Sequence, residues 1–214
     1  MPAASESPSD PVDAVDPVDA ASPGDDRLRF ACTCGALSGH LAAGSVKQGS
    51  RILCHCADCR AVELHHGCPD PAGTGVDLLQ LNPDMVAIDH GAEHLSLLQL
   101  SPRGVFRWYA GCCGTPLFNT PRTAKLPFIA VRAALFAEPD SLGKVIAQTF
   151  IPKKGKPPQH KGAGRMTYKL IGRMVSARIT GRWKQSPLFD RDTGAPVVAP
   201  QILSKADRKA LGKA

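Results

Sequence analysis

The stretch Cys54-His55-Cys56-Ala57-Asp58-Cys59 brings three thiols within six residues. Disulfide geometry largely excludes bridges between cysteines this close together, whereas thiolates one to three residues apart can converge on a zinc ion at about 2.3 Å per bond. The same interpretation extends to Cys32-Thr33-Cys34 upstream and to Cys112-Cys113 downstream. Seven of the eight cysteines are therefore candidate zinc ligands, and Cys68 stands alone.

A secreted disulfide framework is the alternative for this cysteine content. It needs an even number of cysteines, which the chain has, and a signal peptide, which residues 1–26 do not resemble because they contain neither a base nor an apolar core. No apolar run approaches the roughly 18 to 20 residues that cross a bilayer. We therefore expect a cytoplasmic protein without a transmembrane segment, whose thiols stay reduced and free for metal.

Charge divides the 214 residues into three parts. Residues 1–26 hold seven acids and no base, and their Pro-, Ala- and Ser-rich composition predicts a disordered acidic tail. Residues 27–150 are nearly balanced, with 11 basic and 9 acidic residues, and are predicted to form the zinc-binding domain. Residues 151–214 carry 15 basic and 3 acidic residues, so the net charge of +7 arises mainly from this C-terminal extension.

The middle part is predicted to be mainly β, because short apolar stretches alternate with Gly and Pro and none has a long 3.6-residue period. The expected strands are Leu28–Cys32, Arg51–Cys54, Asp77–Leu81, His94–Leu100, Val105–Tyr109 and Phe128–Ala134. Ser101-Pro-Arg-Gly104 suits a type I turn, with Pro at the second position and Gly at the fourth. This hairpin would present Cys112 and Cys113 at a strand end.

Three ordered motifs carry a resemblance to a known family. Cys-x-Cys-Gly at 32–35, Cys-His-Cys-x-x-Cys-Arg at 54–60 and an aromatic-rich strand running into Cys-Gly-Thr-Pro at 113–116 resemble the glutathione-dependent formaldehyde-activating enzyme and centromere protein V superfamily. The match covers roughly residues 28–140 and is similar to an uncharacterised bacterial branch with a Cys-Cys third motif. It implies a β-tent fold with two zincs, a structural one held by the first and third motifs and another held by the middle motif.

Spacing supports this division independently for the first and third motifs. Cys32 and Cys34 supply two ligands, and a closed structural site needs two more, which Cys112 and Cys113 can provide across some 80 residues. The third motif departs from the family pattern, since Ala110 stands where the other cysteine belongs. Adjacent side chains in a strand point to opposite faces, so both cysteines bind one ion only if the backbone bends. Otherwise Cys112 is a small buried hydrophobe.

The middle motif differs in kind because it has three thiolates and no obvious fourth protein ligand. A zinc with three protein ligands and an open position is typical of catalytic sites. In this interpretation a zinc ion is held by Cys54, Cys56 and Cys59, and a substrate thiol such as glutathione supplies its fourth ligand. The alternative is a second structural site, closed by Cys68, His65 or His66.

Residues beside the middle motif are weaker candidates for substrate contacts. Arg60 can bind a carboxylate of a peptide-like thiol through its planar fork, or it can form only a surface ion pair with a neighbour such as Asp58. His65 and His66 are candidate proton carriers, because imidazole titrates close to neutral pH. His55, between two ligands, is expected to face solvent or to donate to a group behind the site.

The C-terminal extension is predicted to begin with a solvated linker at 153–158 and to continue as a basic helix. Its apolar residues recur at helical spacing, namely Leu170, Ile171, Met174, Val175, Ile179 and Trp183. We expect this stripe to dock on the domain and the charges to face solvent; binding of nucleic acid or of an anionic membrane surface is the alternative. Ser204 is expected to begin a short final helix with Asp207 at its third position.

Two functions follow from these patterns. The first is an enzyme, a carbon–sulfur lyase that joins or splits a thiol and a small aldehyde at an open three-cysteine zinc, as the resemblance implies. The second is a non-catalytic binding module, in which two structural zincs hold a β scaffold and the basic C-terminal segment engages a polyanion or a protein partner. The vacancy of the fourth position at the middle zinc distinguishes them.

Overall fold

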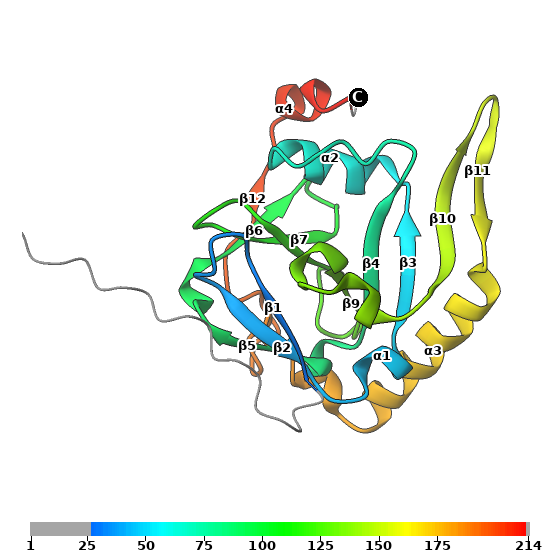
Figure 1. Ribbon diagram of the computed structural model, residues 1–214. Coiled ribbons are helices and arrows are strands. Elements are labelled where there is room, and N and C mark those ends of the chain that lie inside the picture. Colours follow the sequence, from blue (N-terminus) through cyan, green and yellow to red (C-terminus); the bar gives the residue numbers. More distant parts are fainter. Residues whose placement is uncertain (1–26, 213–214) are drawn as a thin grey trace, which may run out of the picture.

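Two β-sheets dominate the computed structural model, which describes residues 27–212 (Figure 1). The strands are β1 (Leu28–Ala31), β2 (Ser38–Leu41), β3 (Ser50–Cys54), β4 (Val76–Leu81), β5 (Val86–His90), β6 (Leu95–Gln99), β7 (Phe106–Ala110), β8 (Pro116–Thr120), β9 (Ile129–Arg132), β10 (Val145–Lys153), β11 (Lys156–Lys161) and β12 (Gln201–Ile202). The larger sheet runs in the order β11-β10-β3-β4-β9-β8-β7-β6-β12, and β1-β2-β5 form the smaller one. The predicted mainly β class is confirmed.

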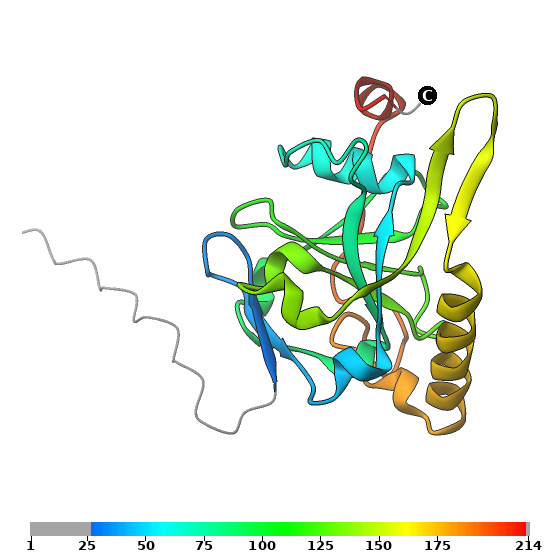
Figure 2. The same ribbon diagram turned by 45° about the vertical axis from the view of Figure 1, so that its right-hand side comes forward.

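Short helices connect and flank the strands. The α-helices are α1 (Ser45–Gln48), α2 (Ala57–His65), α3 (Ala163–Ile179) and α4 (Lys205–Ala210), and the 3-10 turns are η1 (Pro83–Met85), η2 (Ala92–His94), η3 (Ala133–Leu135), η4 (Pro139–Leu142) and η5 (Arg182–Lys184). Figures 1 and 2 show α2 at one end of β3, α4 beyond α2, and α3 along the outer side of the sheet near β10. None of the described helices is both long enough and apolar enough to cross a membrane.

The core lies where the two sheets face each other. Phe30 of the smaller sheet meets Phe118 of the larger sheet edge-on, with ring centroids 5.6 Å apart. Trp108 is fully buried beside them and donates a hydrogen bond from Nε1 to Thr120 Oγ1 at 2.9 Å. Alternation along the strands puts these large side chains on one face, which explains why the sheets must pack together.

The six predicted strands all form, and none of their ends differs by more than two residues from the one expected. The predicted turn is also present, since Gly104 N donates to Ser101 O at 2.9 Å. Helix α2 was not expected, because Cys56 caps it with a thiol where a side-chain oxygen is usual. The predicted acidic tail, residues 1–26, lies outside the described residues.

The predicted linker at 153–158 is wrong. Strands β10 and β11 pair antiparallel around Gly155, whose φ of 66° suits a tight turn, and β10 also pairs with β3 in parallel. Strand β10 therefore spans the expected boundary at residue 150. The β10–β11 hairpin adds two strands to the edge of the sheet. The lysines of this hairpin face solvent, as the sequence indicated.

Helix α3 begins earlier than predicted and buries only part of its expected apolar stripe. The outer half of its expected apolar stripe is exposed, with Ile171, Val175 and Ile179 at 55%, 50% and 81%. Arg173 and Ala177 face inward instead, and Arg173 Nη1 donates to Gln48 O at 2.8 Å. The expectation that this stripe docks on the domain is therefore wrong for half of its residues.

The predicted final helix is confirmed as α4. Ser204 accepts a hydrogen bond from Asp207 N at 3.1 Å and donates one to Asp207 Oδ2 at 2.7 Å, which is the expected capping arrangement. The preceding strand β12 pairs in parallel with β6 and holds this segment on the domain.

The Trp108–Thr120 pair offers a direct test of the core. Thr120→Val keeps the side-chain shape but leaves the buried indole N–H without its acceptor, so we expect a loss of about 1–3 kcal/mol in the free energy of unfolding. Chemical denaturation of the metal-loaded protein measures this loss. Thr74→Val, at an exposed hydroxyl, is the matched control and should change stability by less than about 0.5 kcal/mol. Equal stabilities of the two variants would contradict the prediction.

Candidate metal centres

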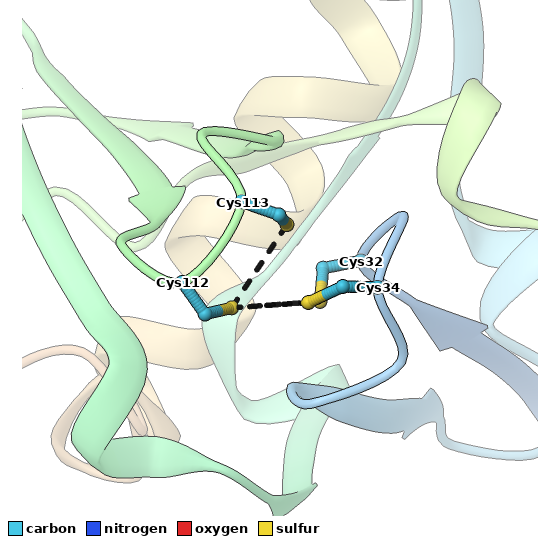
Figure 3. A group of neighbouring side chains, drawn as sticks. All are labelled: Cys32, Cys34, Cys112 and Cys113. Atoms are coloured by element: carbon cyan, nitrogen blue, oxygen red, sulfur yellow. Dashed lines mark hydrogen bonds between the residues drawn. The ribbon is translucent and has the colours of Figure 1, made fainter.

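The first cluster joins loops that lie far apart in the sequence. Cys32 and Cys34 follow β1, and Cys112 and Cys113 follow β7 (Figure 3). The Sγ atoms of Cys34 and Cys112 are 3.4 Å apart. All four sulfurs lie within 4.8 Å of one another. The four predicted ligands are therefore brought together.

A sharp turn lets both adjacent cysteines take part. Ala110 O accepts hydrogen bonds from Cys113 N at 3.3 Å and from Gly114 N at 2.7 Å, while Ala110 N donates to Thr115 O at 2.9 Å. Gly114 has a φ of 73°, a left-handed conformation that glycine adopts without strain. The chain therefore leaves the strand geometry after Ala110, which is the bend that joint ligation requires.

The sulfur separations fit a tetrahedral metal site. Four sulfurs at about 2.3 Å from one ion would lie about 3.8 Å apart. The separations are 3.5 Å for Cys32–Cys34, 3.9 Å for Cys32–Cys112 and 3.9 Å for Cys112–Cys113. Only a small adjustment of side chains would make this group a closed four-thiolate site, so it can hold a metal ion.

Hydroxyl groups polarise the first cluster. Thr115 Oγ1 lies 3.0 Å from Cys113 Sγ and 2.8 Å from Thr33 Oγ1. Burial raises the pKa of the Cys113 thiol, but hydrogen bonds with Thr115 and Thr33 outweigh burial and lower the pKa to about 5. Cys113 therefore supplies a thiolate at neutral pH, which is the form that binds metal.

The middle cluster is built at the junction of β3 and α2. Cys54 ends the strand, Cys56 caps the helix, and Cys59 lies in the first helical turn. The distances from Cys54 Sγ to the Cys56 and Cys59 sulfurs are 3.4 and 3.5 Å. Cys56 Sγ also accepts a hydrogen bond from Cys59 N at 3.3 Å, so the cap itself orients two of the three thiols.

Hydrogen bonding concentrates negative charge on one sulfur of the middle cluster. Hydrogen bonds with the Cys56 and Cys59 thiols lower the pKa of the Cys54 thiol to about 2. The same contacts, together with burial, raise the pKa of Cys59 well above its ordinary value. A metal ion entering this cluster must therefore displace protons, which makes its affinity depend on pH.

Among the described residues, no fourth His, Cys, Asp or Glu joins Cys54, Cys56 and Cys59. Cys68 and His66 line a separate cavity of about 530 Å³ that reaches Cys113, and His65 is exposed. The alternative of a middle site closed by one of these three side chains is therefore not supported by the geometry.

A cavity of about 280 Å³ opens beside the middle cluster. Its lining includes Cys54 and Cys56 from the cluster, Arg60 from α2, and Leu211 and Gly212 from the C-terminal end of the described chain. This volume is just below the usual range of small-molecule pockets. A small ligand in the cavity would lie against the thiols.

Sequence reasoning missed Arg107, which stands behind the middle cluster. Its side chain comes from β7, is only 6% exposed, and places Nη1 at 3.6 Å from Cys59 Sγ. Its Nη2 lies 3.7 Å from Asp58 Oδ2. The guanidinium attracts thiolate charge and opposes the rise in the pKa of Cys59. An arginine between Phe106 and Trp108 in an otherwise apolar strand was the available signal.

Arg60 and His66, two of the candidates for substrate contacts, lie in different environments. Arg60 forms a bidentate pair with Asp70, at 2.7 and 2.6 Å, rather than with Asp58. His66 packs its ring 4.6 Å from that of Tyr109, and burial lowers its pKa to about 4. His66 is thus uncharged at neutral pH, and the expectation that it titrates near working pH is wrong.

His55 does not face solvent through its Nε2 atom. This nitrogen is buried and has no hydrogen-bond partner among the described residues. The ring packs so closely on Gly75 that an added Cβ there would lie 2.9 Å from it. The imidazole also lines the cavity beside Cys54 and Cys56, so it belongs to the wall of the middle site.

A mainly β fold that carries one four-cysteine and one three-cysteine cluster defines a candidate metal-binding protein. The chain belongs to a family of unknown function (DUF6151), which it matches over residues 26–199, a span that includes both clusters. No curated protein matches the chain. A crystal structure of a Rhodobacter sphaeroides protein, a structural-genomics target, is 22% identical, with a TM-score of 0.39 over 55% of this chain and 97% of that chain.

The two clusters should differ in their contribution to stability. Cys32→Ser or Cys113→Ser removes a ligand from a site that ties distant loops together, so we expect the melting temperature of the zinc-loaded protein to fall by roughly 10 °C or more. Cys59→Ser should lower the melting temperature clearly less, because its site joins β3 and α2, which are adjacent in the chain. Cys68→Ser, outside both clusters, is the control. Equal losses at Cys32, Cys113 and Cys59 would contradict the prediction.

Arg107 should strengthen metal binding at the middle cluster. Arg107→Gln removes the charge beside Cys59, and we expect the zinc affinity of this cluster to fall about 10- to 100-fold, the usual effect of losing a group behind the ligands. Arg107→Lys keeps a positive charge and should lose less zinc affinity. Competition with a chromophoric chelator measures the zinc affinities of both clusters. The affinity of the four-cysteine cluster should stay unchanged and serves as an internal control. Identical affinities in all three proteins would refute the role.

Proposed function

We propose that the protein binds two zinc ions, one in each cysteine cluster, and that the two ions have different roles. The donor sets support zinc because thiolate-only, roughly tetrahedral groups are typical of it. All eight cysteines are free thiols, so the seven in the clusters are available to bind metal. In this proposal the four-cysteine site is structural and the three-cysteine site takes an exogenous ligand.

The observation that carries the proposal is the cavity beside a cluster of three thiols that has no fourth protein ligand among the described residues. We propose that a small thiol such as glutathione occupies this cavity. The activity is then that of a carbon–sulfur lyase acting on a thiol–aldehyde adduct, as in the glutathione-dependent formaldehyde-activating enzymes that the motifs resemble. A zinc ion bound there would lower the pKa of the thiol.

The chain's own residues would bind and orient such a thiol. Arg60 reaches the cavity, and its pairing with Asp70 holds the guanidinium in a fixed position from which it can contact a ligand carboxylate. Leu211 and Gly212 line the same cavity, and Gly212 lies close to the Arg60 guanidinium. In the joining direction the thiol sulfur bonds to the aldehyde carbon, and the thiol proton ends on the aldehyde oxygen. Splitting reverses both changes.

The alternative function is a non-catalytic zinc-stabilised binding module. A specific observation favours it, because residues 144–184 contain 11 basic residues and no acidic ones. In that case both zincs are structural, and the basic C-terminal segment engages a polyanion or a protein partner. An experiment on the middle cluster distinguishes the two functions.

Elemental analysis should find two zincs per chain, and glutathione should bind the middle one. With cobalt in place of zinc, we expect added glutathione to change the sulfur-to-metal charge-transfer bands and to accelerate hemithioacetal exchange with formaldehyde in exchange spectroscopy. Cys56→Ala should abolish both effects while the four-cysteine site stays loaded. Arg60→Ala should weaken the binding of glutathione several-fold. It should leave the binding of cysteamine, a thiol without a carboxylate, unaffected.

Three outcomes would decide against the proposal. A folded, metal-free protein with reduced thiols would remove the metal sites. Two bound metals with no spectral response to thiols would favour the binding module. A spectral response without faster exchange would keep thiol binding but reject the lyase activity, because thiol addition to formaldehyde is already easy without a catalyst.

A further inference from the structure

Helix α3 presents an apolar stripe to solvent. Tyr168, Ile171, Val175 and Ile179 are 82%, 55%, 50% and 81% exposed. Their spacing of three or four residues places them on one side of the helix, along about 16 Å of its length. Figures 1 and 2 both show this helix at the outer edge of the molecule, with the sheet on its inner side.

The side of α3 that faces the domain is only partly apolar, because the buried Arg173 lies there beside Ala177 and Met166. Lys169 Nζ donates to Gly49 O at 3.0 Å, and Arg173 Nη1 donates to Gln48 O at 2.8 Å. Arg173 Nε and Nη2 are buried without a hydrogen-bond partner among the described residues, which is a costly arrangement. An amphipathic helix normally buries its apolar stripe and solvates its charges. Packing within the chain therefore does not explain the exposed stripe.

Strong positive charge accompanies the stripe on α3 and on the neighbouring hairpin. The segment from Lys144 to Lys184, which holds β10, β11 and α3, has 11 basic residues and no acidic ones. Eight of the basic side chains are exposed and form no ion pair among the described residues: Lys144, Lys153, Lys154, Lys156, Lys161, Arg165, Arg178 and Lys184. The β10–β11 hairpin adds a further exposed apolar ring, Phe150.

We propose that α3 and the β10–β11 hairpin form a docking surface for an anionic phospholipid membrane. The stripe lies at the level of the headgroups, and the lysines and arginines contact lipid phosphates. Exposed aliphatic and aromatic side chains among basic residues are the combination that binds such an interface. The exposed side chains of this surface belong to neither cysteine cluster, although Pro152 of β10 also lines the cavity beside Cys54 and Cys56. Lipid binding by these side chains requires neither a bound metal nor an activity at the clusters.

The charge pattern argues against the other occupants. A second copy of the chain would bring two strongly positive segments together, which repel each other. Nucleic acid would neutralise the lysines but would leave most of the apolar stripe exposed to water, because phosphate contacts supply most of such binding. A lipid surface satisfies the charges and the apolar stripe together.

Vesicle flotation tests the proposal on the full, zinc-loaded chain. We expect the protein to float with vesicles of equimolar phosphatidylcholine and phosphatidylglycerol but not with phosphatidylcholine alone. The double variant Ile171→Ser, Ile179→Ser should partition at least about tenfold more weakly, because it removes two insertable side chains. Lys153→Glu with Lys154→Glu should also weaken binding, and so should salt, since the Debye length falls from about 10 Å at 0.1 M to about 3 Å at 1 M.

Controls of the same chemistry lie elsewhere on the surface. Leu126→Ser and Lys125→Glu, at exposed positions of the loop between β8 and β9, should leave flotation unchanged, and all variants should melt like the parent protein. Absence of binding to the anionic vesicles would overturn the proposal. So would equal binding by the Ile171, Ile179 double variant. Binding of duplex DNA without lipid binding, or a dimer that this double variant dissociates, would assign the surface to nucleic acid or to a second copy instead.

Discussion

The turn from Ala110 to Thr115 is the constraint on which the rest of the structure depends. It brings Cys112 and Cys113 against Cys32 and Cys34, and so connects the smaller sheet to the end of β7. The Thr33 N–H donates to Thr115 Oγ1 at 3.1 Å across the same gap. Because these loops are some 80 residues apart, a metal bound here would reduce the conformational freedom of the unfolded chain as well as stabilise the folded one.

Strand β7 also connects the two clusters. One end of it leads into the turn that carries Cys112 and Cys113, and its second residue, Arg107, reaches Cys59 of the middle cluster. A buried central strand is rigid, because both of its neighbours, β6 and β8, are hydrogen-bonded to it. The position of the charge behind Cys59 is therefore fixed by the same element that holds the first cluster.

Local patterns predicted much of this structure, and long-range packing decided the rest. The strands, the Ser101–Gly104 turn and the Ser204 cap depend on neighbours in the sequence, and these predictions are confirmed. The cysteine clusters were predictable because closely spaced thiols point to metal. Arg107 was missed because its partner lies 48 residues away. The orientation of α3 was also not predictable, since the backbone carbonyls that hold Lys169 and Arg173 come from Gly49 and Gln48 at the C-terminal end of α1, some 120 residues away.

Charge accounts for the different burial of the two clusters. Four thiolates around a divalent zinc ion would leave two net negative charges, and this cluster keeps Cys34 and Cys112 exposed, where water screens the excess. Three thiolates would leave one negative charge in a cluster where Cys54 and Cys59 are buried, and an uncompensated charge there would be costly. Arg107 supplies the opposite charge at 3.6 Å from Cys59. Arg107 would thus compensate a buried three-thiolate zinc site only in part, because Asp58 Oδ2, 3.7 Å from Arg107 Nη2, shares its positive charge. A fourth ligand that entered as an anionic thiolate would therefore add negative charge to a buried site, at a cost that a neutral ligand would avoid.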